Sequence, residues 1–195
     1  MTAGPPRPFS RIEITDRRFL RLVRWAHPDP LGVGPGGSRF VPAPGAAGGQ
    51  AFRALYAARD LATAFAETIL RDEAVDRPQD FPVAMAELEA WSVVELRVRA
   101  LSLVDLTGDA PLRARIASDA VRARDQAEGR RLGAEIHADP RGFDGALYPS
   151  RLTTGENIVV FERAISRGLA AEARGPLLDA AGFGEVLDRF RVGLV

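Results

Sequence analysis

A stretch rich in glycine and proline, residues 31–50, places the strongest constraint on what this 195-residue chain can fold into. Ten of its twenty residues are glycine or proline, so it cannot continue a helix or a strand. Within it, the letters GVGPGG fit G-x-G-x-x-G, the spacing found in Rossmann dinucleotide-binding folds. That motif must open a helix, whereas here Pro42 and Pro44 follow and forbid one. The stretch therefore predicts a loop, either a plain surface loop or one that lets a ligand approach its backbone.

Short segments in which apolar and polar residues alternate predict strands around this loop. The clearest runs from Val94 to Arg99, where Val94, Leu96 and Val98 share one face. Five further segments have strand character and are predicted at residues 9–14, 19–24, 54–57, 145–150 and 158–162. The order of the segments does not follow strict βαβ alternation, which favours a mixed α+β fold over a parallel sheet.

Helices are predicted between the strands. Asp60 can cap a helix that runs to about Arg71. Its predicted apolar stripe is formed by Leu61, Ala64, Phe65, Thr68 and Ile69. A second helix is predicted to start near Pro111 with Asp109 in capping range, a third covers about residues 124–138, and residues 176–190 add a short helix before a last strand. Without repeats or a clear linker, residues 1–195 are predicted to form a single domain.

The composition excludes several kinds of function. The formal net charge is zero, which argues against a general binder of nucleic acid or anionic membranes. All 26 basic residues are arginine, so no lysine is available for a Schiff base or a P-loop. Cysteine is absent and histidine occurs only as His27 and His137, so we expect no metal site. The first ten residues lack the apolar run of a signal peptide, and we expect a soluble, cytoplasmic protein.

Arg39 and Glu67 are candidates for a binding or catalytic site. The planar guanidinium of Arg39 could grip a pyrophosphate or a ribose, or could simply be solvated or paired with an acid. Glu67 lies off the apolar stripe, on the face of Asp60, Thr63 and Arg71. Its carboxylate either forms an i,i+4 ion pair with Arg71, worth only about 0.3–0.5 kcal/mol, or lies at a pocket edge. There it would stabilise a developing oxocarbenium ion or hold a ribose hydroxyl.

Tyr56 and Ser150 are further candidates, each at the end of a predicted strand. The ring of Tyr56 could stack on a flat heterocycle while its hydroxyl donates a hydrogen bond, or it could belong to the core. The hydroxyl of Ser150 could bond a phosphate or a sugar, or could belong to a turn. No histidine is near Ser150 in the sequence, so nothing local makes it a nucleophile. His27 is predicted to lie in a loop. Taken singly, these residues do not decide the function.

Three blocks of sequence resemble the signature blocks of the RES family, which is named for an arginine, a glutamate and a serine. The blocks lie within about residues 19–162, in the family's order, and read GGSRF, LYAARDLATAFAET and GALYPSRLTTGENIVVFER. By this resemblance, Arg39, Glu67 and Ser150 match the three residues that give the family its name. Tyr56 matches the tyrosine of the second block.

Two features depart from the family's pattern. The family's additional early arginine has Arg21 in FLRLV as its preferred match, with Arg24 as the alternative. The loop between Arg39 and Tyr56 is longer than usual, with AAGGQ as the inserted segment. Residues 163–195 follow the third block, and we expect them to pack on the same domain.

The resemblance implies a fold like that of ADP-ribosyltransferases, with a split, twisted sheet and flanking helices around a cleft for NAD⁺. It implies that NAD⁺ is the substrate, that no metal is required, and that Glu67, Arg39 and Tyr56 are catalytic. Arg39, Tyr56, Ser150 and Arg21 would contact NAD⁺. It also implies a toxin of a bacterial toxin–antitoxin pair, neutralised by a partner with an Xre-type helix-turn-helix domain.

Three classes of function are compatible with these residues. The first is an NAD⁺-degrading toxin that transfers ADP-ribose to water or phosphate, the second is a protein ADP-ribosyltransferase, and the third is a non-catalytic module that binds a partner. Cleavage of NAD⁺ requires an anion near the ribose, donors for the pyrophosphate and a flat surface for nicotinamide. Glu67, Arg39 and Tyr56 supply these chemical types, so the first class is our prediction.

Overall fold

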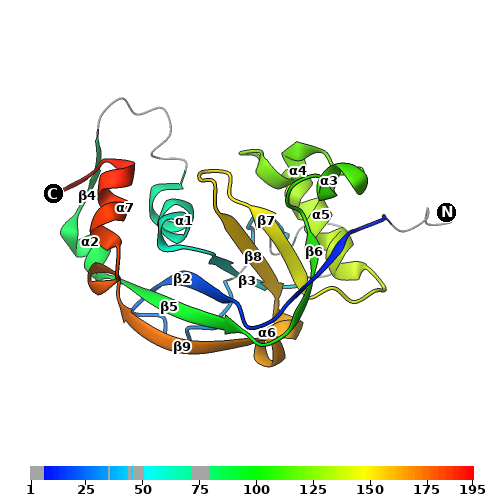
Figure 1. Cartoon of the computed structure of the whole chain (residues 1–195), viewed down its shortest axis with the longest axis horizontal. Coiled ribbons are helices and arrows are strands. Elements are labelled where there is room, and N and C mark those ends of the chain that lie inside the picture. Colours follow the sequence, from blue (N-terminus) through cyan, green and yellow to red (C-terminus); the bar gives the residue numbers. More distant parts are fainter. Residues whose placement is uncertain (1–6, 35, 44, 46–50, 72–79) are drawn as a thin grey trace.

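The computed structural model describes residues 7–34, 36–43, 45, 51–71 and 80–195, and Figure 1 shows how they are arranged. The frame is one strongly curved sheet. Its eight strands follow the order β1 (Arg11–Ile14), β6 (Leu101–Asp105), β7 (Gly145–Pro149), β8 (Glu156–Phe161), β3 (Ala54–Ala58), β2 (Arg18–Arg24), β5 (Trp91–Val98) and β9 (Leu169–Pro176). Strands β6 and β7 are parallel, and every other neighbouring pair in this sheet is antiparallel.

The sheet is almost divided between β2 and β3. These strands are joined by a single residue pair, Leu20 with Ala58, whereas β2 pairs along its whole length with β5. The two halves can therefore diverge, and Figure 1 shows β2, β5 and β9 curving away from β7 and β8. The predicted mixed α+β fold, with a split and twisted sheet, is confirmed.

Helices flank both halves of the sheet. They are α1 (Leu61–Phe65) with the π-helical turn η1 (Ala66–Leu70), α2 (Met85–Glu89), α3 (Ala110–Arg113), α4 (Ser118–Arg122), α5 (Ala127–Ala138), α6 (Glu162–Gly168), the 3₁₀ turn η3 (Leu177–Asp179) and α7 (Phe183–Phe190). Near α7, β10 (Val192–Leu194) pairs in parallel with β4 (Phe81–Val83). In Figure 1, α1, α2 and α7 lie at one end of the molecule and α3, α4 and α5 at the other.

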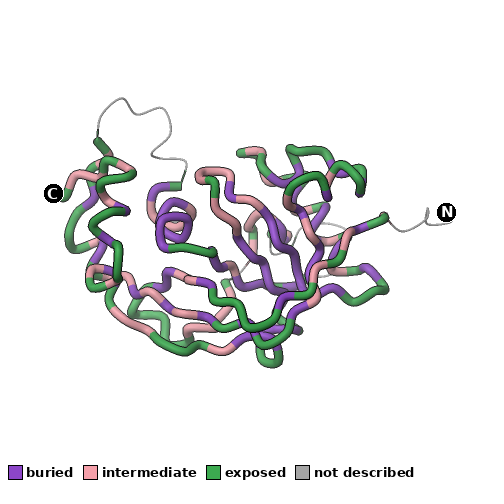
Figure 2. Tube along the Cα trace, viewed as in Figure 1, coloured by how far each residue is buried: buried purple, intermediate pink, exposed green. Residues whose placement is uncertain are grey.

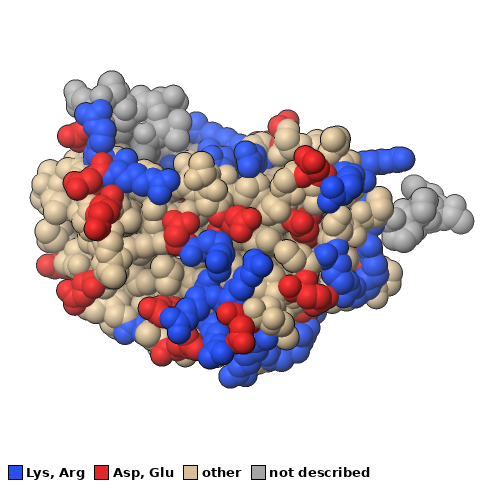
Figure 3. Space-filling model, in the orientation of Figure 1, with Lys and Arg blue, Asp and Glu red and all other residues tan. Residues whose placement is uncertain are grey.

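Three apolar clusters bury the faces of these elements. One packs α5 against β7 and β8, one packs α6 against β2, β5 and β8, and one packs α1 against α7. Figure 2 shows the buried segments concentrated along the central strands. The predicted alternation in β5 is confirmed, because Val94, Leu96 and Val98 are fully buried. On the face shown in Figure 3, basic and acidic side chains are interspersed. Arg97 and Asp16 form one such ion pair.

The helix predicted after Asp60 begins as expected and then departs from α-geometry. The Thr63 amide donates to Asp60 Oδ1 at 2.8 Å, which confirms the cap. From Ala66 onward the chain forms a π-helical turn, which ends at Arg71 with a φ of 46°. Because a π-turn bonds each residue to the fifth one along, the next buried side chain after Phe65 and Ala66 is Leu70. The predicted stripe is confirmed at Leu61, Ala64 and Phe65, and Ile69 packs against the same apolar cluster, but the prediction is wrong at Thr68, which lines the cleft described below.

Several other predictions differ from the structure in their boundaries. The third helix begins at Ala127 and not at residue 124, because Asp125 Oδ1 accepts the Ala127 amide and starts the first turn there. The strand predicted at residues 9–14 begins only at Arg11. The tail forms η3, α7 and the predicted last strand, whereas β4, β6, β9, α2, α4 and α6 were not predicted. Edge strand β9 shows why, because most of its side chains are not buried and it lacks an apolar alternation. The AAGGQ segment lies outside the described residues.

Candidate functional site

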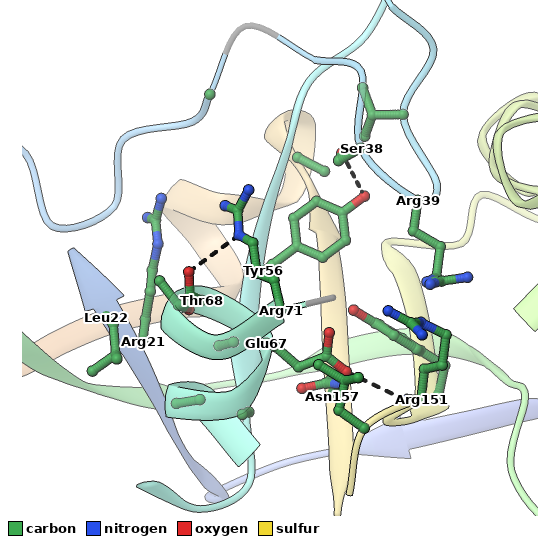
Figure 4. Close-up of a pocket in the computed structure, with 18 of the residues that line it drawn as sticks. Arg21, Leu22, Ser38, Arg39, Tyr56, Glu67, Thr68, Arg71, Arg151 and Asn157 are labelled. Atoms are coloured by element: carbon green, nitrogen blue, oxygen red, sulfur yellow. Dashed lines mark hydrogen bonds between the residues drawn. The ribbon is translucent and has the colours of Figure 1, made fainter. Parts of the chain in front are cut away.

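A cleft of about 590 Å³ lies between the α1–η1 segment, the strands β2 and β3, and the end of the glycine-rich loop. This volume is within the range of about 300–1,000 Å³ that is usual for ligand pockets. Figure 4 shows the side chains that line it. The charged residues in its lining are one glutamate and four arginines, namely Glu67, Arg21, Arg39, Arg71 and Arg151. The cleft is therefore suited to an anionic ligand that develops positive charge at one point.

Glu67 is held by a set of hydrogen bonds that converge on one oxygen. Its Oε1 accepts from Ser150 Oγ at 2.6 Å, from the Arg151 amide at 3.3 Å and from Asn157 Nδ2 at 3.4 Å. Within the described part of the chain, this leaves Oε2 as the oxygen that can meet a ligand. The Arg71 guanidinium turns away and donates from Nε to the Thr68 carbonyl at 3.1 Å. These contacts favour the pocket-edge interpretation of Glu67 over an i,i+4 ion pair.

Ser150 lies behind Glu67 and is not part of the cleft lining. It is 2% exposed. Its Oγ donates to Glu67 and accepts from the amides of Leu152 and Thr153, at 3.0 and 3.1 Å. A hydroxyl has one proton and two lone pairs, so these three bonds use its full capacity. In this arrangement, Ser150 has no hydrogen bond left for a phosphate or a sugar.

The loop that carries Ser150 is fastened to the start of α1. Thr63 Oγ1 donates to Asp60 Oδ2 and also contacts Thr153 Oγ1, both at 2.9 Å. A Cβ at Gly155 would overlap Thr63 Oγ1 and lie 2.8 Å from Asp60 Oδ2, so only glycine fits there. The helix cap that was predicted from the sequence thus also fixes the loop whose serine holds Glu67.

Tyr56 connects the cleft floor to the glycine-rich loop. Its hydroxyl oxygen accepts from Ser38 Oγ at 2.9 Å and from the Phe40 amide at 3.1 Å. Burial raises the pKa of Tyr56 to about 12, against the opposing effect of these bonds. The phenol therefore stays protonated at neutral pH. With both lone pairs engaged, its own proton remains for donation.

Arg39 and Arg21 approach the cleft from two sides. Arg39 Nη1 donates to the Ala123 carbonyl at 2.8 Å, and Arg21 Nη1 donates to the Pro30 carbonyl at 3.0 Å. Burial lowers the pKa of Arg21, and the charge of Asp29 opposes that shift. Each guanidinium has five donors, so both retain donors beyond these bonds.

The two candidates for the early arginine are separated by the structure. Arg21 lines the cleft. Arg24 instead pairs with Glu87 at 2.6 Å and lies over the ring of Trp91 at 4.7 Å. Of the predicted site residues, Arg21, Arg39, Tyr56 and Glu67 thus line one cleft, and Ser150 supports it from behind.

Sequence reasoning missed several residues of the cleft. Asn157 is the most informative, because it is 3% exposed and bonds to Glu67. A polar residue next to the apolar run IVVF of β8 was the available signal. Arg71, Arg151 and Ser38 also contribute, but nothing in their local sequence marks them.

Among the described residues, histidines and acids form no group of three or more that could hold a metal ion. In the same part of the chain, no helix is both long and apolar enough to cross a membrane.

Fold and cleft together define a small α+β domain with a cationic ligand pocket built around one hydrogen-bonded carboxylate. The chain belongs to the RES-domain family, whose model matches residues 8–180. It is 34% identical over 128 residues to a protein of Sinorhizobium fredii (strain NBRC 101917 / NGR234) named "Probable toxin y4kH", a match that spans 65% of this chain and 100% of that protein. The chain is also similar in fold to a solved structure from M. tuberculosis, described as the MbcT–MbcA toxin–antitoxin complex. Here the TM-score is 0.65 and the identity 22%, over 90% of this chain and 91% of the other.

Proposed function

We propose that this protein is the toxin of a toxin–antitoxin pair and that it acts by cleaving NAD⁺ between nicotinamide and ribose. The observation that carries the proposal is the single carboxylate of Glu67, fixed through Oε1 in a cleft whose other charged residues are arginines. The names of the two similar proteins support the toxin role. The family resemblance supports NAD⁺ as the substrate.

The chemistry places one demand on the carboxylate. When the bond between C1′ of the ribose and the pyridinium nitrogen breaks, its electron pair goes to the nitrogen and nicotinamide leaves as a neutral molecule. The ribose is left with oxocarbenium character, which an anion stabilises more in the transition state than in the ground state. In this proposal Oε2 of Glu67 provides the anion, because the hydrogen bonds of the carboxylate fall on Oε1. Water or phosphate then attacks C1′, and when water attacks, its proton can pass to Glu67.

The remaining cleft residues supply binding and orientation. Arg39 and Arg21 would hold the pyrophosphate and a ribose through guanidinium donors. The free proton of the Tyr56 hydroxyl would donate to the substrate beside its ring. Ser150 is reassigned in this proposal from a ligand contact to a positioning residue, because all its hydrogen bonds are used to hold Glu67 and its own loop.

The proposed partner is an antitoxin with an Xre-type helix-turn-helix domain that restrains the activity in the host. A protein that degrades NAD⁺ without restraint would harm its own cell. Expression of the chain alone should therefore stop growth and deplete NAD⁺, and co-expression with the protein of the neighbouring gene should restore both. Harmless expression with constant NAD⁺ would contradict the toxin role.

The direct test is NAD⁺ consumption by purified protein. Glu67→Gln keeps the side chain's shape and removes its charge, so we expect cleavage to slow by about 10²-fold or more, the scale of losing one electrostatic stabiliser. KM should change less, because the ribose is uncharged in the ground state. Glu89→Gln is the matched control, since Glu89 is an exposed glutamate at the end of α2.

The products separate the possible acceptors. Formation of ADP-ribose in a reaction without phosphate would identify water as the acceptor. Formation of ADP-ribose 1″-phosphate when phosphate is added would identify phosphate as the acceptor. ADP-ribose attached to protein would instead favour a protein ADP-ribosyltransferase. A Glu67→Gln protein that melts normally and consumes NAD⁺ at the wild-type rate would refute the role of Glu67.

A further inference from the structure

Helix α5 carries two glycines that lie directly against the backbone of the arginine-bearing loop. Gly129 and Gly133 are about one turn apart in this helix. A Cβ at Gly129 would lie 2.6 Å from the carbonyl oxygen of Arg39 and 3.0 Å from that of Ala120 in α4. A Cβ at Gly133 would overlap the carbonyl oxygen of Phe40 and lie 2.6 Å from its carbonyl carbon. Side chains essentially never approach backbone closer than 3.0 Å, so both positions admit only glycine while the loop stays where it is.

The same two loop residues are held from the opposite side. The Phe40 amide donates to the Tyr56 hydroxyl, and the Phe40 ring is fully buried against Tyr148 with the ring centroids 4.8 Å apart. The backbone of Arg39 and Phe40 is therefore confined between α5 and the floor of the cleft. The Arg39 side chain continues this restraint by donating to the Ala123 carbonyl, just before α5.

We infer that Gly129 and Gly133 are positioning residues, which let the Arg39 backbone lie directly on α5 and thereby fix its guanidinium for the substrate's pyrophosphate. This inference rests on the proposed function only in naming that ligand. Neither glycine lines the cleft. Both act through the Arg39–Phe40 backbone.

The size of the effect follows from the geometry. Non-bonded carbon atoms in contact lie about 3.5–4.0 Å apart. A methyl group at Gly133 would lie 2.6 Å from the Phe40 carbonyl carbon, so that carbon must move away by about 1 Å. A misplacement of about 1 Å at a substrate-binding group can cost up to about 10²-fold. Alanine is also a better helix former than glycine, so helix α5 itself does not lose stability from the change. A loss of function would thus report the position of the loop and not a broken helix.

The experiment compares Gly129→Ala and Gly133→Ala with Gly184→Ala. Gly184 lies in α7, and a Cβ there meets nothing within 4 Å, so this variant controls for the general effect of alanine in a helix. Two readouts are measured on each protein. The first is the pair KM and kcat for NAD⁺, and the second is hydrogen–deuterium exchange of the peptide that contains the Phe40 amide.

We expect both α5 variants to raise KM by about tenfold or more and to change kcat less, because the damage falls on ground-state binding. Exchange at Phe40 should become faster, since the loop must leave the Tyr56 hydroxyl. Gly184→Ala should match the wild type in both readouts. Gly129→Ala decides the matter if Gly133→Ala fails to fold, because its overlap is milder.

The inference is overturned if a folded Gly129→Ala protein keeps wild-type KM and wild-type exchange at Phe40. A fall in kcat at constant KM would also overturn it, since that pattern does not describe lost binding. If the wild type does not cleave NAD⁺, the proposed function fails by itself. Faster hydrogen–deuterium exchange at Phe40 in the α5 variants would then still support the role of these glycines in holding the Arg39–Phe40 backbone against α5.

Discussion

Substitution of Ser150 by alanine tests the hydrogen-bond network that fixes Glu67. The change removes one hydrogen bond to a charged group, worth about 1.5–3 kcal/mol. It also removes the acceptor of the half-buried amides of Leu152 and Thr153, at about 1 kcal/mol each, the low end of the cost of an unsatisfied group. We therefore expect the free energy of unfolding to fall by about 3.5–5 kcal/mol, a large part of the stability of a domain.

The loss is measurable in a thermal melt. For a domain of this size, each kcal/mol lowers the melting temperature by about 2–4 °C, so the Ser150→Ala protein should melt at least about 7 °C lower. Ser118→Ala is the matched control, because Ser118 is exposed and its Oγ has one long contact of 3.4 Å. A thermal effect alone would not separate a positioning role from a structural one.

The positioning role requires a second measurement, below the melting transition. Without Ser150, the carboxylate of Glu67 keeps only its longer bonds to Arg151 and Asn157 and can rotate. We expect kcat for NAD⁺ cleavage to fall by about tenfold or more while KM changes little. A Ser150→Ala protein that melts like Ser118→Ala and turns over like the wild type would refute this reasoning.

Three further predictions concern residues outside this network. Arg39→Ala should raise KM for NAD⁺ about tenfold or more, and Arg39→Lys should recover only part of the loss, because lysine lacks the planar fork. Burial, followed by the charge of Arg163, holds the pKa of His137 below its ordinary 6.5. The contribution of His137 to the free energy of unfolding is therefore present above pH 6.5 and is lost as the pH falls through the folded-state pKa. His137→Phe should flatten the pH dependence of the free energy of unfolding, measured in urea, between these two pH values. Gly145→Ala should prevent folding, since Gly145 has a φ of 156° and a Cβ there would overlap the Val159 carbonyl, whereas Gly175→Ala, with open space around it, should melt like the wild type.

The sequence by itself determined features that depend on neighbours along the chain. Alternation identified the buried face of β5, and the cap at Asp60 located the start of α1. The prolines after GVGPGG excluded a Rossmann helix, and that stretch forms a loop where the structure describes it. The three signature blocks singled out Arg39, Tyr56 and Glu67, which line the cleft. Such signals are readable because capping, alternation and helix breaking act within a few residues.

Only the tertiary structure decided how these residues work together. Ser150 and Glu67 are 83 positions apart, and their bond exists because β8 pairs between β7 and β3 and brings the Ser150 loop against α1. Because of this pairing, the hydroxyl of Ser150 bonds to Glu67 and to its own loop and does not line the cleft. The π-turn at Ala66 was likewise invisible, because helical periodicity assumes a constant number of residues per turn. Periodicity and motifs report local geometry, whereas hydrogen bonds between distant segments depend on strand pairing, and that pairing is decided only when the whole core is packed.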